Sequence, residues 1–152
     1  MNFIGIDPGK KGCACSISED GIISFAQFSE HEYVKFIALN RDAFAVVEKV
    51  HSSPQMGVTS AFSFGENFGF IRGILTSYRV PYELVLPQKW KKHFGVTADK
   101  NTSIECAHRL FPEVSLYTSE RCRKESDGMA ESLLMAEYAR RIYNRQYPME
   151  GV

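Results

Sequence analysis

The sequence has few cysteines, and none is placed as a zinc site or a secreted disulfide framework would require. Cys13, Cys15, Cys106 and Cys122 do not follow the paired spacing of zinc ligands. Cys13 and Cys15 fall on the same face of an expected strand. We therefore expect free thiols with a structural role, as in proteins of a reducing compartment.

An excess of charge of one sign is also missing. Lys and Arg number 18, Asp and Glu number 18, and the formal net charge is +0. The protein as a whole therefore has no field that attracts a polyanion. Any nucleic-acid site must be built from local clusters of basic residues.

Long apolar runs and low-complexity tracts are absent as well. The first residues contain no basic stretch followed by an apolar segment, so we expect no signal peptide, no membrane span and a cytoplasmic, soluble protein. The 152 residues are 44% apolar and show no break in composition. This composition predicts one globular domain, residues 1–152, with a substantial core.

The first clear pattern is an apolar strand that ends in a carboxylate and a Pro-Gly turn. Alternation places Phe3, Gly5 and Asp7 on one face of the strand and Ile4 and Ile6 on the other. Asp7 has two interpretations at this point. It caps the turn, as Asp before Pro-Gly often does, or it points into a cleft at the end of a central strand.

The rest of the chain alternates between strand and helix patterns. Strands at 13–18 and 22–28 are joined by an Asp-Gly turn, so the fold opens with three antiparallel strands. The dense apolar run at 43–50 is typical of a buried parallel strand, and 81–86 is a further short strand. The expected helices are 30–39 with Ser29 as N-cap, 59–78 with Thr59 or Ser60 as N-cap, 89–93, 101 or 102 to 111, and 127–141.

Glu48 is an acid at the end of the buried-strand pattern. It simply marks where the strand reaches the surface, or it pairs with Asp7. If the two strands are parallel, both acids lie at the same edge of the sheet, where open α/β sheets place their sites. Two like charges about 4 Å apart repel by roughly 4 kcal/mol at an effective dielectric near 20. A divalent cation is the obvious group to offset that repulsion.

Two more acids begin the last helix. Asp127 and Glu131 are four residues apart and therefore project from the same side of the helix. Acids in a first turn are also favoured by the helix dipole, and Ser126 or Asp127 can serve as N-cap. Glu131 lies beside the buried stripe, which favours a site. Together the four acids predict two Mg²⁺ ions, replaceable by Mn²⁺, that promote hydrolysis of a phosphodiester.

Basic residues gather around the single tryptophan. Lys89, Lys91, Lys92 and His93 surround Trp90, and this mixture suits a phosphate backbone. The alternative is a solvated lysine face with the tryptophan packed beneath it. A second basic cluster lies in an expected loop and consists of Arg121, Arg123 and Lys124.

The helix expected at 59–78 contains a repeated glycine. The four-residue spacing of Gly65, Gly69 and Gly73 leaves a smooth groove along the helix. Its aromatic residues are Phe62, Phe64, Phe68 and Phe70. This stripe is more typical of a core or a subunit interface than of a cofactor site.

Three acidic motifs carry a resemblance to a known family. The chain resembles the RuvC-type Holliday junction resolvases, most closely their compact phage, bacterial and plastid versions, over nearly its whole length. The motifs are Ile4-Gly5-Ile6-Asp7-Pro8-Gly9, Val46-Val47-Glu48 and Asp127-Gly128-Met129-Ala130-Glu131-Ser132-Leu133-Leu134. The resemblance implies an α/β, RNase H-like fold with a five-stranded mixed sheet flanked by helices. It also implies a homodimer, formed through the helix at 59–78, that nicks a four-way DNA junction symmetrically.

The resemblance assigns roles to particular residues. The catalytic and metal-binding residues would be Asp7, Glu48, Asp127 and Glu131. Lys91 or Lys92 and Lys100 fall where the family places DNA-contacting lysines. With the other basic candidates of the chain, the full set of candidate DNA-binding residues is Lys10, Lys11, His51, Lys91, Lys92, Lys100, Arg121, Arg123 and Lys124. Two features depart from the family pattern: the last two acids are four apart where many members have three, and His51 stands where some members insert an aromatic wedge. Phe62 is another candidate for that wedge.

Two other functions are compatible with the sequence. One is an RNase H-like nuclease that acts on RNA or on other branched DNA. The other is a non-catalytic binding module or an actin-like phosphate-binding domain, because similar glycine-rich openings occur in sugar kinases. The short chain argues against the latter, since 152 residues leave no room for a second lobe to clamp a nucleotide.

Overall fold

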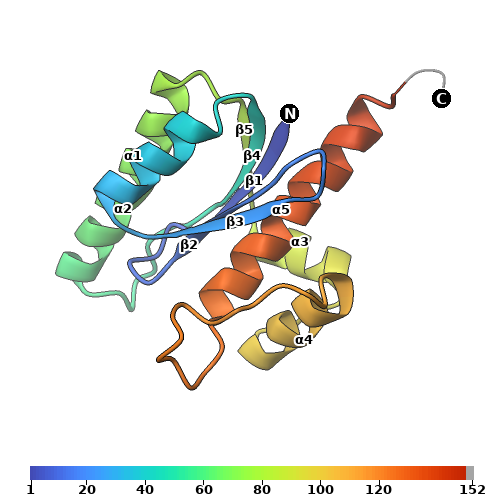
Figure 1. Ribbon diagram of the computed structural model, residues 1–152. Helices are drawn as coiled ribbons and strands as arrows, with labels where there is room; N and C mark the ends of the chain where they lie inside the picture. Colours follow the sequence, from blue (N-terminus) through green and yellow to red (C-terminus); the bar gives the residue numbers. More distant parts are fainter. Residues whose placement is uncertain (150–152) are drawn as a thin grey trace.

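A five-stranded mixed sheet forms the centre of the molecule (Figure 1). The structure is a computed structural model that describes residues 1–149. The strands are β1 (Asn2–Ile6), β2 (Cys13–Ile17), β3 (Ile23–Gln27), β4 (Ala43–Glu48) and β5 (Tyr82–Val85), in the spatial order β3-β2-β1-β4-β5. The pairs β1–β2 and β2–β3 are antiparallel, whereas β1–β4 and β4–β5 are parallel. The expected α/β fold with three antiparallel and then two parallel strands is confirmed.

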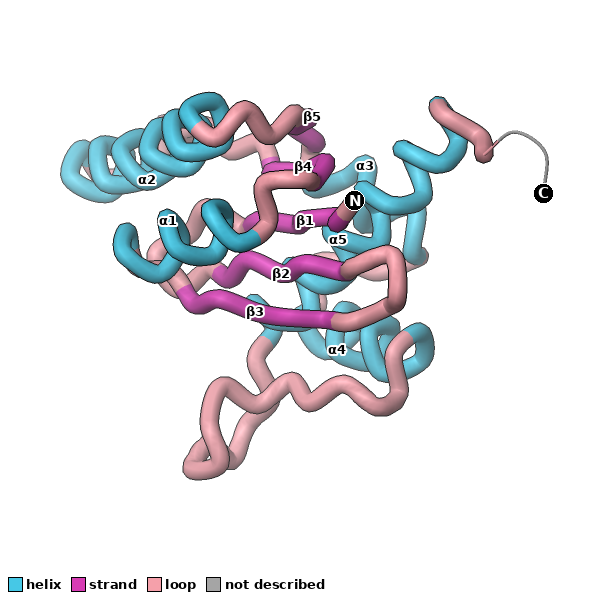
Figure 2. The backbone as a smooth tube through the Cα atoms, turned by 45° about the horizontal axis from the view of Figure 1, so that its top comes forward, coloured by secondary structure: helices cyan, strands magenta, loops and turns pink. Residues whose placement is uncertain are grey.

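Helices cover both faces of this sheet. They are α1 (Glu30–Leu39), α2 (Val58–Ser77), α3 (Pro87–Phe94), α4 (Lys100–Leu110) and α5 (Asp127–Gln146). Figure 2 shows α1 and α2 on one side of the sheet and α3, α4 and α5 on the other. The long helix α5 packs directly against β1, β2 and β4.

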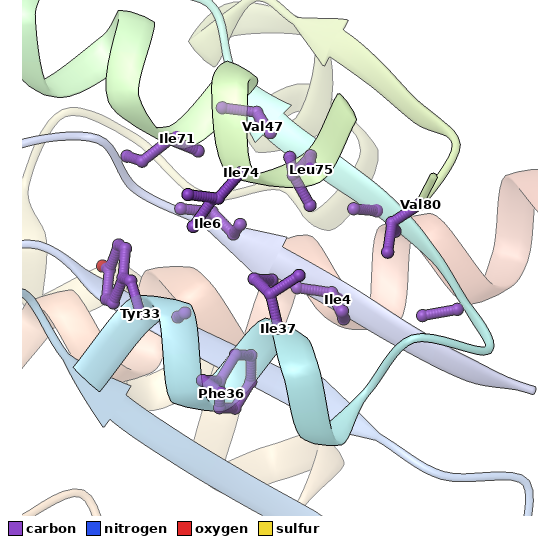
Figure 3. Packing of buried hydrophobic residues seen from close by; sticks show 13 residues of the cluster. Ile4, Ile6, Tyr33, Phe36, Ile37, Val47, Ile71, Ile74, Leu75 and Val80 are labelled. Carbon is purple, nitrogen blue, oxygen red and sulfur yellow. The ribbon is translucent and has the colours of Figure 1, made fainter. Parts of the chain in front are cut away.

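The alternation in β1 divides the core as the sequence predicts. Ile4 and Ile6 are fully buried beneath α1 and α2, where they join Val47 of β4 (Figure 3). Phe3 faces the other way, into the cluster that α3 and α5 build. The two layers therefore rest on opposite faces of the same central strand.

Gly5 sets how closely α5 approaches the sheet. A Cβ atom at this position would lie 2.3 Å from the backbone N of Ala136 and 2.3 Å from the backbone O of Ser132. Only a residue without a side chain allows this approach. Gly5 thereby brings the first turns of α5 beside the end of β1.

Several predicted element ends are correct and others are wrong. Ser29 and Ser126 cap α1 and α5 with their side chains, as expected. Helix α2 begins at Val58 with Gly57 as N-cap and no side-chain capping bond, so the prediction of Thr59 or Ser60 as the cap was wrong.

Other element ends differ from the prediction as well. β4 ends at Glu48, two residues earlier than the apolar pattern suggests. α4 begins at Lys100 because the Asp99 side chain accepts from the Asn101 N–H. α5 continues past Arg141 to Gln146, since Tyr143 still packs on the aromatic rings of β1 and β4.

Candidate active site

Asp7 and Glu48 lie at the carboxyl ends of two neighbouring parallel strands, at the same edge of the sheet. The register pairs Ile6 with Val47, so the next position on each strand carries an acid. Asp7 also stabilises its own turn, because its Oδ1 accepts from the Gly9 N–H at 3.1 Å. The turn-capping interpretation of Asp7 is therefore confirmed, and the residue also lies at the strand end, next to the strand that ends in Glu48.

The start of α5 brings two more carboxylates to this edge. Ser126 caps the helix by accepting from the Met129 N–H, so Asp127 is the first helical residue. Glu131 follows one turn later, with a side chain only 13% exposed. The close approach of α5 to Gly5 is what allows this helix to reach the end of β1.

The pKa values show that these acids influence one another. The pKa of Glu131 is raised to about 7, chiefly by burial; Lys91 lowers it, and the charges of Asp7, Glu48 and Asp127 add to the rise. Burial likewise raises the pKa of Asp7 and of Glu48. The charges of the other three acids therefore act on Glu131 at the carboxyl edge of the sheet.

Two lysines already offset part of this charge. The Lys100 Nζ lies 2.7 Å from Oδ2 of Asp127, and the Lys91 Nζ lies 3.9 Å from Oε1 of Glu131. Hydrogen bonding to Asp127 raises the pKa of Lys100. The sequence predicted these lysines as DNA contacts but did not predict that they pair with the acids.

Trp90 is a functional candidate that the sequence interpretation missed. It is fully buried, so the aromatic ring does not lie on a DNA-facing surface. The packing that the alternative expected is correct for Trp90, but Lys91 is largely buried and pairs with Glu131 and so is not part of a solvated lysine face. Its indole N–H donates to Oε2 of Glu48 at 2.8 Å. A buried tryptophan usually needs an acceptor for its N–H, and that rule was the available signal.

The donor set suits a hard divalent cation. All four acids offer carboxylate oxygens, which are the ligands that Mg²⁺ prefers. As the side chains stand, no three His, Cys, Asp or Glu within residues 1–149 are grouped so as to hold one metal ion. Asp127 and Glu131 are instead turned to lysines. The residues therefore fit the ion chemically, and binding would require these two acids to exchange a lysine for the metal.

The remaining basic candidates lie around this edge with exposed side chains. Lys10 and Lys11 line a cavity of about 340 Å³ beside the start of α5. Lys92 lines another, of about 520 Å³, together with Lys91. His51 is exposed on the loop between β4 and α2, and the cluster in the loop between α4 and α5 is exposed at Arg121, Arg123 and Lys124.

Solved structures with the same fold are known. RuvC of T. thermophilus in complex with a Holliday junction substrate matches with a TM-score of 0.66 and 14% identity, over 97% of this chain and 96% of that one. The chain has a RuvC-type fold. Another Thermus thermophilus RuvC structure matches with a TM-score of 0.63 and 18% identity, over 93% of this chain and 96% of the other.

The similarity to these two structures is one of fold, at low sequence identity. No family model matches the sequence, and no curated protein matches it. None of the helices described within residues 1–149 is both long and apolar enough to cross a lipid bilayer.

Proposed function

We propose that this protein is a divalent-metal-dependent endonuclease that cuts branched DNA, with the four-way junction as its substrate. The observation that supports the proposal is a RuvC-type sheet in which the ends of β1 and β4 and the start of α5 carry Asp7, Glu48, Asp127 and Glu131 at the same edge. One of the similar structures is a complex of RuvC with a Holliday junction, which supports the choice of substrate.

The four acids would hold the metal. Asp7, Glu48, Asp127 and Glu131 supply enough oxygen ligands for two Mg²⁺ ions, with Mn²⁺ as a substitute. When bound, such ions polarise the scissile phosphodiester and stabilise the charge on the leaving oxygen. The protein's own part is to hold these ligands at fixed positions on a rigid strand edge and a helix start.

The lysines beside the acids would bind the phosphates of the DNA backbone. With Asp127 and Glu131 holding the metal, the ammonium groups of Lys91 and Lys100 would be free to neutralise the DNA backbone. The exposed basic side chains farther out would extend that contact along the arms of the junction. They are Lys10, Lys11, His51, Lys92, Arg121, Arg123 and Lys124.

The proposed homodimer would form through α2. On this helix Val58 is 88% exposed and Phe62 is 73% exposed to solvent. The helix also has open space at three glycines, because a Cβ atom at Gly65, Gly69 or Gly73 would have no neighbouring atom within 4 Å. The open glycine stripe allows close approach of a second helix. Two copies related by a two-fold axis would place two active sites on a junction with matching symmetry.

The test is a Mg²⁺-dependent cleavage assay on a synthetic four-way junction, with linear duplex and an RNA–DNA hybrid as parallel substrates. We expect junction cleavage by the native protein, and none by Asp7→Asn, which keeps the size of the side chain and removes the charge. Junction binding by Asp7→Asn should persist. Equal cleavage of duplex or hybrid, or full activity of Asp7→Asn, would contradict the proposal.

A further inference from the structure

Trp90 brings into the core a polar N–H group that packing alone does not require. It is the only tryptophan in the chain, lies on α3 and is fully buried among apolar side chains such as Val46 and Val85. A phenylalanine or leucine would serve packing alone. The indole instead places its N–H 2.8 Å from Oε2 of Glu48, the acid at the end of β4.

The two side chains that form this hydrogen bond differ in conformational freedom. The indole ring is held by the core on the α5 side of the sheet, so its N–H points in a fixed direction. The Glu48 side chain has rotatable bonds and is partly exposed at the site. The bond therefore restrains the carboxylate through Oε2 and leaves Oε1 for a ligand.

We propose that Trp90 is a positioning residue for Glu48, whose indole N–H fixes the orientation of the carboxylate toward a divalent cation. This inference rests on the proposed function, because it concerns the same site. Within residues 1–149, the side chains of Asp127 and Glu131 pair with long lysine side chains, whereas Glu48 is held by a rigid aromatic group. Glu48 is thus oriented before the metal arrives, as is Asp7, whose Oδ1 accepts from the Gly9 N–H.

The first experiment measures Mn²⁺ binding by electron paramagnetic resonance on the full chain. Trp90→Phe keeps an aromatic ring but removes the donor, and we expect its affinity for Mn²⁺ to fall about 10- to 100-fold. Phe94→Leu is the matched control, because it truncates another buried aromatic residue of α3 in the same cluster. We expect this control to bind Mn²⁺ as the native protein does.

The second experiment needs no change at Trp90. Because the chain contains one tryptophan, the ¹⁵N-labelled protein gives a single indole N–H resonance. Titration with Mg²⁺ should shift this resonance in the native protein. In Glu48→Gln the amide oxygen still accepts the hydrogen bond but the charge is gone, so the resonance should not respond to Mg²⁺.

The outcomes separate the inference from the proposed function. If the native protein binds Mn²⁺ and cuts junctions, but Trp90→Phe binds Mn²⁺ equally well or the indole resonance ignores Mg²⁺, the inference is wrong and the nuclease assignment stands. If Trp90→Phe does not fold, the titrations of native protein and Glu48→Gln decide alone. A native protein that binds neither Mn²⁺ nor Mg²⁺ overturns both.

Discussion

Neutralising Glu131 should make the metal-free protein more stable. The folded protein raises the pKa of this carboxyl from 4.5 to about 7, chiefly by burial and then by the three neighbouring acids. Each pKa unit corresponds to about 1.4 kcal/mol, so the ionised side chain costs the folded state up to about 3 kcal/mol. Glu131→Gln removes that cost, and because it also removes the ion pair with Lys91, this value is an upper limit.

The gain should depend on pH in a defined direction. Below pH 4.5 the carboxyl is protonated in both the folded and the unfolded protein, so pH does not alter the difference between variant and native. Between 4.5 and about 7 the unfolded chain releases the proton while the folded protein keeps it, and native stability falls as pH rises. Above that window the advantage of Glu131→Gln is complete.

Urea denaturation in the presence of a chelator measures this difference. The free energies of unfolding of native protein and Glu131→Gln are compared near pH 5 and near pH 8, with Glu66→Gln on α2, an exposed acid on the opposite side of the sheet, as control. Added Mg²⁺ should stabilise the native protein more than Glu131→Gln. An advantage of Glu131→Gln that is equal at both pH values would refute the reasoning.

Three further predictions follow from other parts of the structure. Gly5→Ala should cost about 3 kcal/mol or more in thermal or urea unfolding, because its methyl group meets α5 backbone at 2.3 Å; a cost below about 1 kcal/mol would show that α5 can shift. The double variant Lys91→Ala, Lys100→Ala should weaken junction binding. The slope of log K against log salt concentration should become less steep by about 0.9 for each phosphate that is no longer neutralised. Lys89→Ala, which changes an exposed lysine of the same helix, should alter neither the affinity nor the slope. Phe62→Glu, which places a charge on the exposed face of α2, should give monomers in sedimentation velocity, and an unchanged dimer would exclude α2 as the interface.

The sequence was sufficient to predict the sheet and the place of the acids. The Asp-Gly turn, the alternation in the first strand and the dense apolar run of β4 fix strand type and neighbours, and parallel pairing then brings Asp7 and Glu48 together. The role of Gly5 could not be predicted from the sequence, because the α5 backbone that it allows to come close is distant along the chain. The local sequence pattern was therefore sufficient to predict which residues lie side by side on neighbouring strands.

Contacts between side chains of distant elements could not be predicted in this way. Nothing in the local sequence of Lys100 indicates that it will meet Asp127, or that Trp90 will donate to Glu48, because both pairs depend on how helices pack on the sheet. The α2 start at Val58 was missed for a different reason: Gly57 makes no side-chain capping bond, so the usual signal is lacking.

The central claim is that the four carboxylates form one site for divalent cations. The most direct measurement is anomalous diffraction from crystals of the protein soaked in Mn²⁺. We predict anomalous peaks between Asp7, Glu48, Asp127 and Glu131, with Lys91 and Lys100 moved away from their acids. Ordered carboxylates without a peak at millimolar Mn²⁺, and with both lysine pairs intact, would contradict the account.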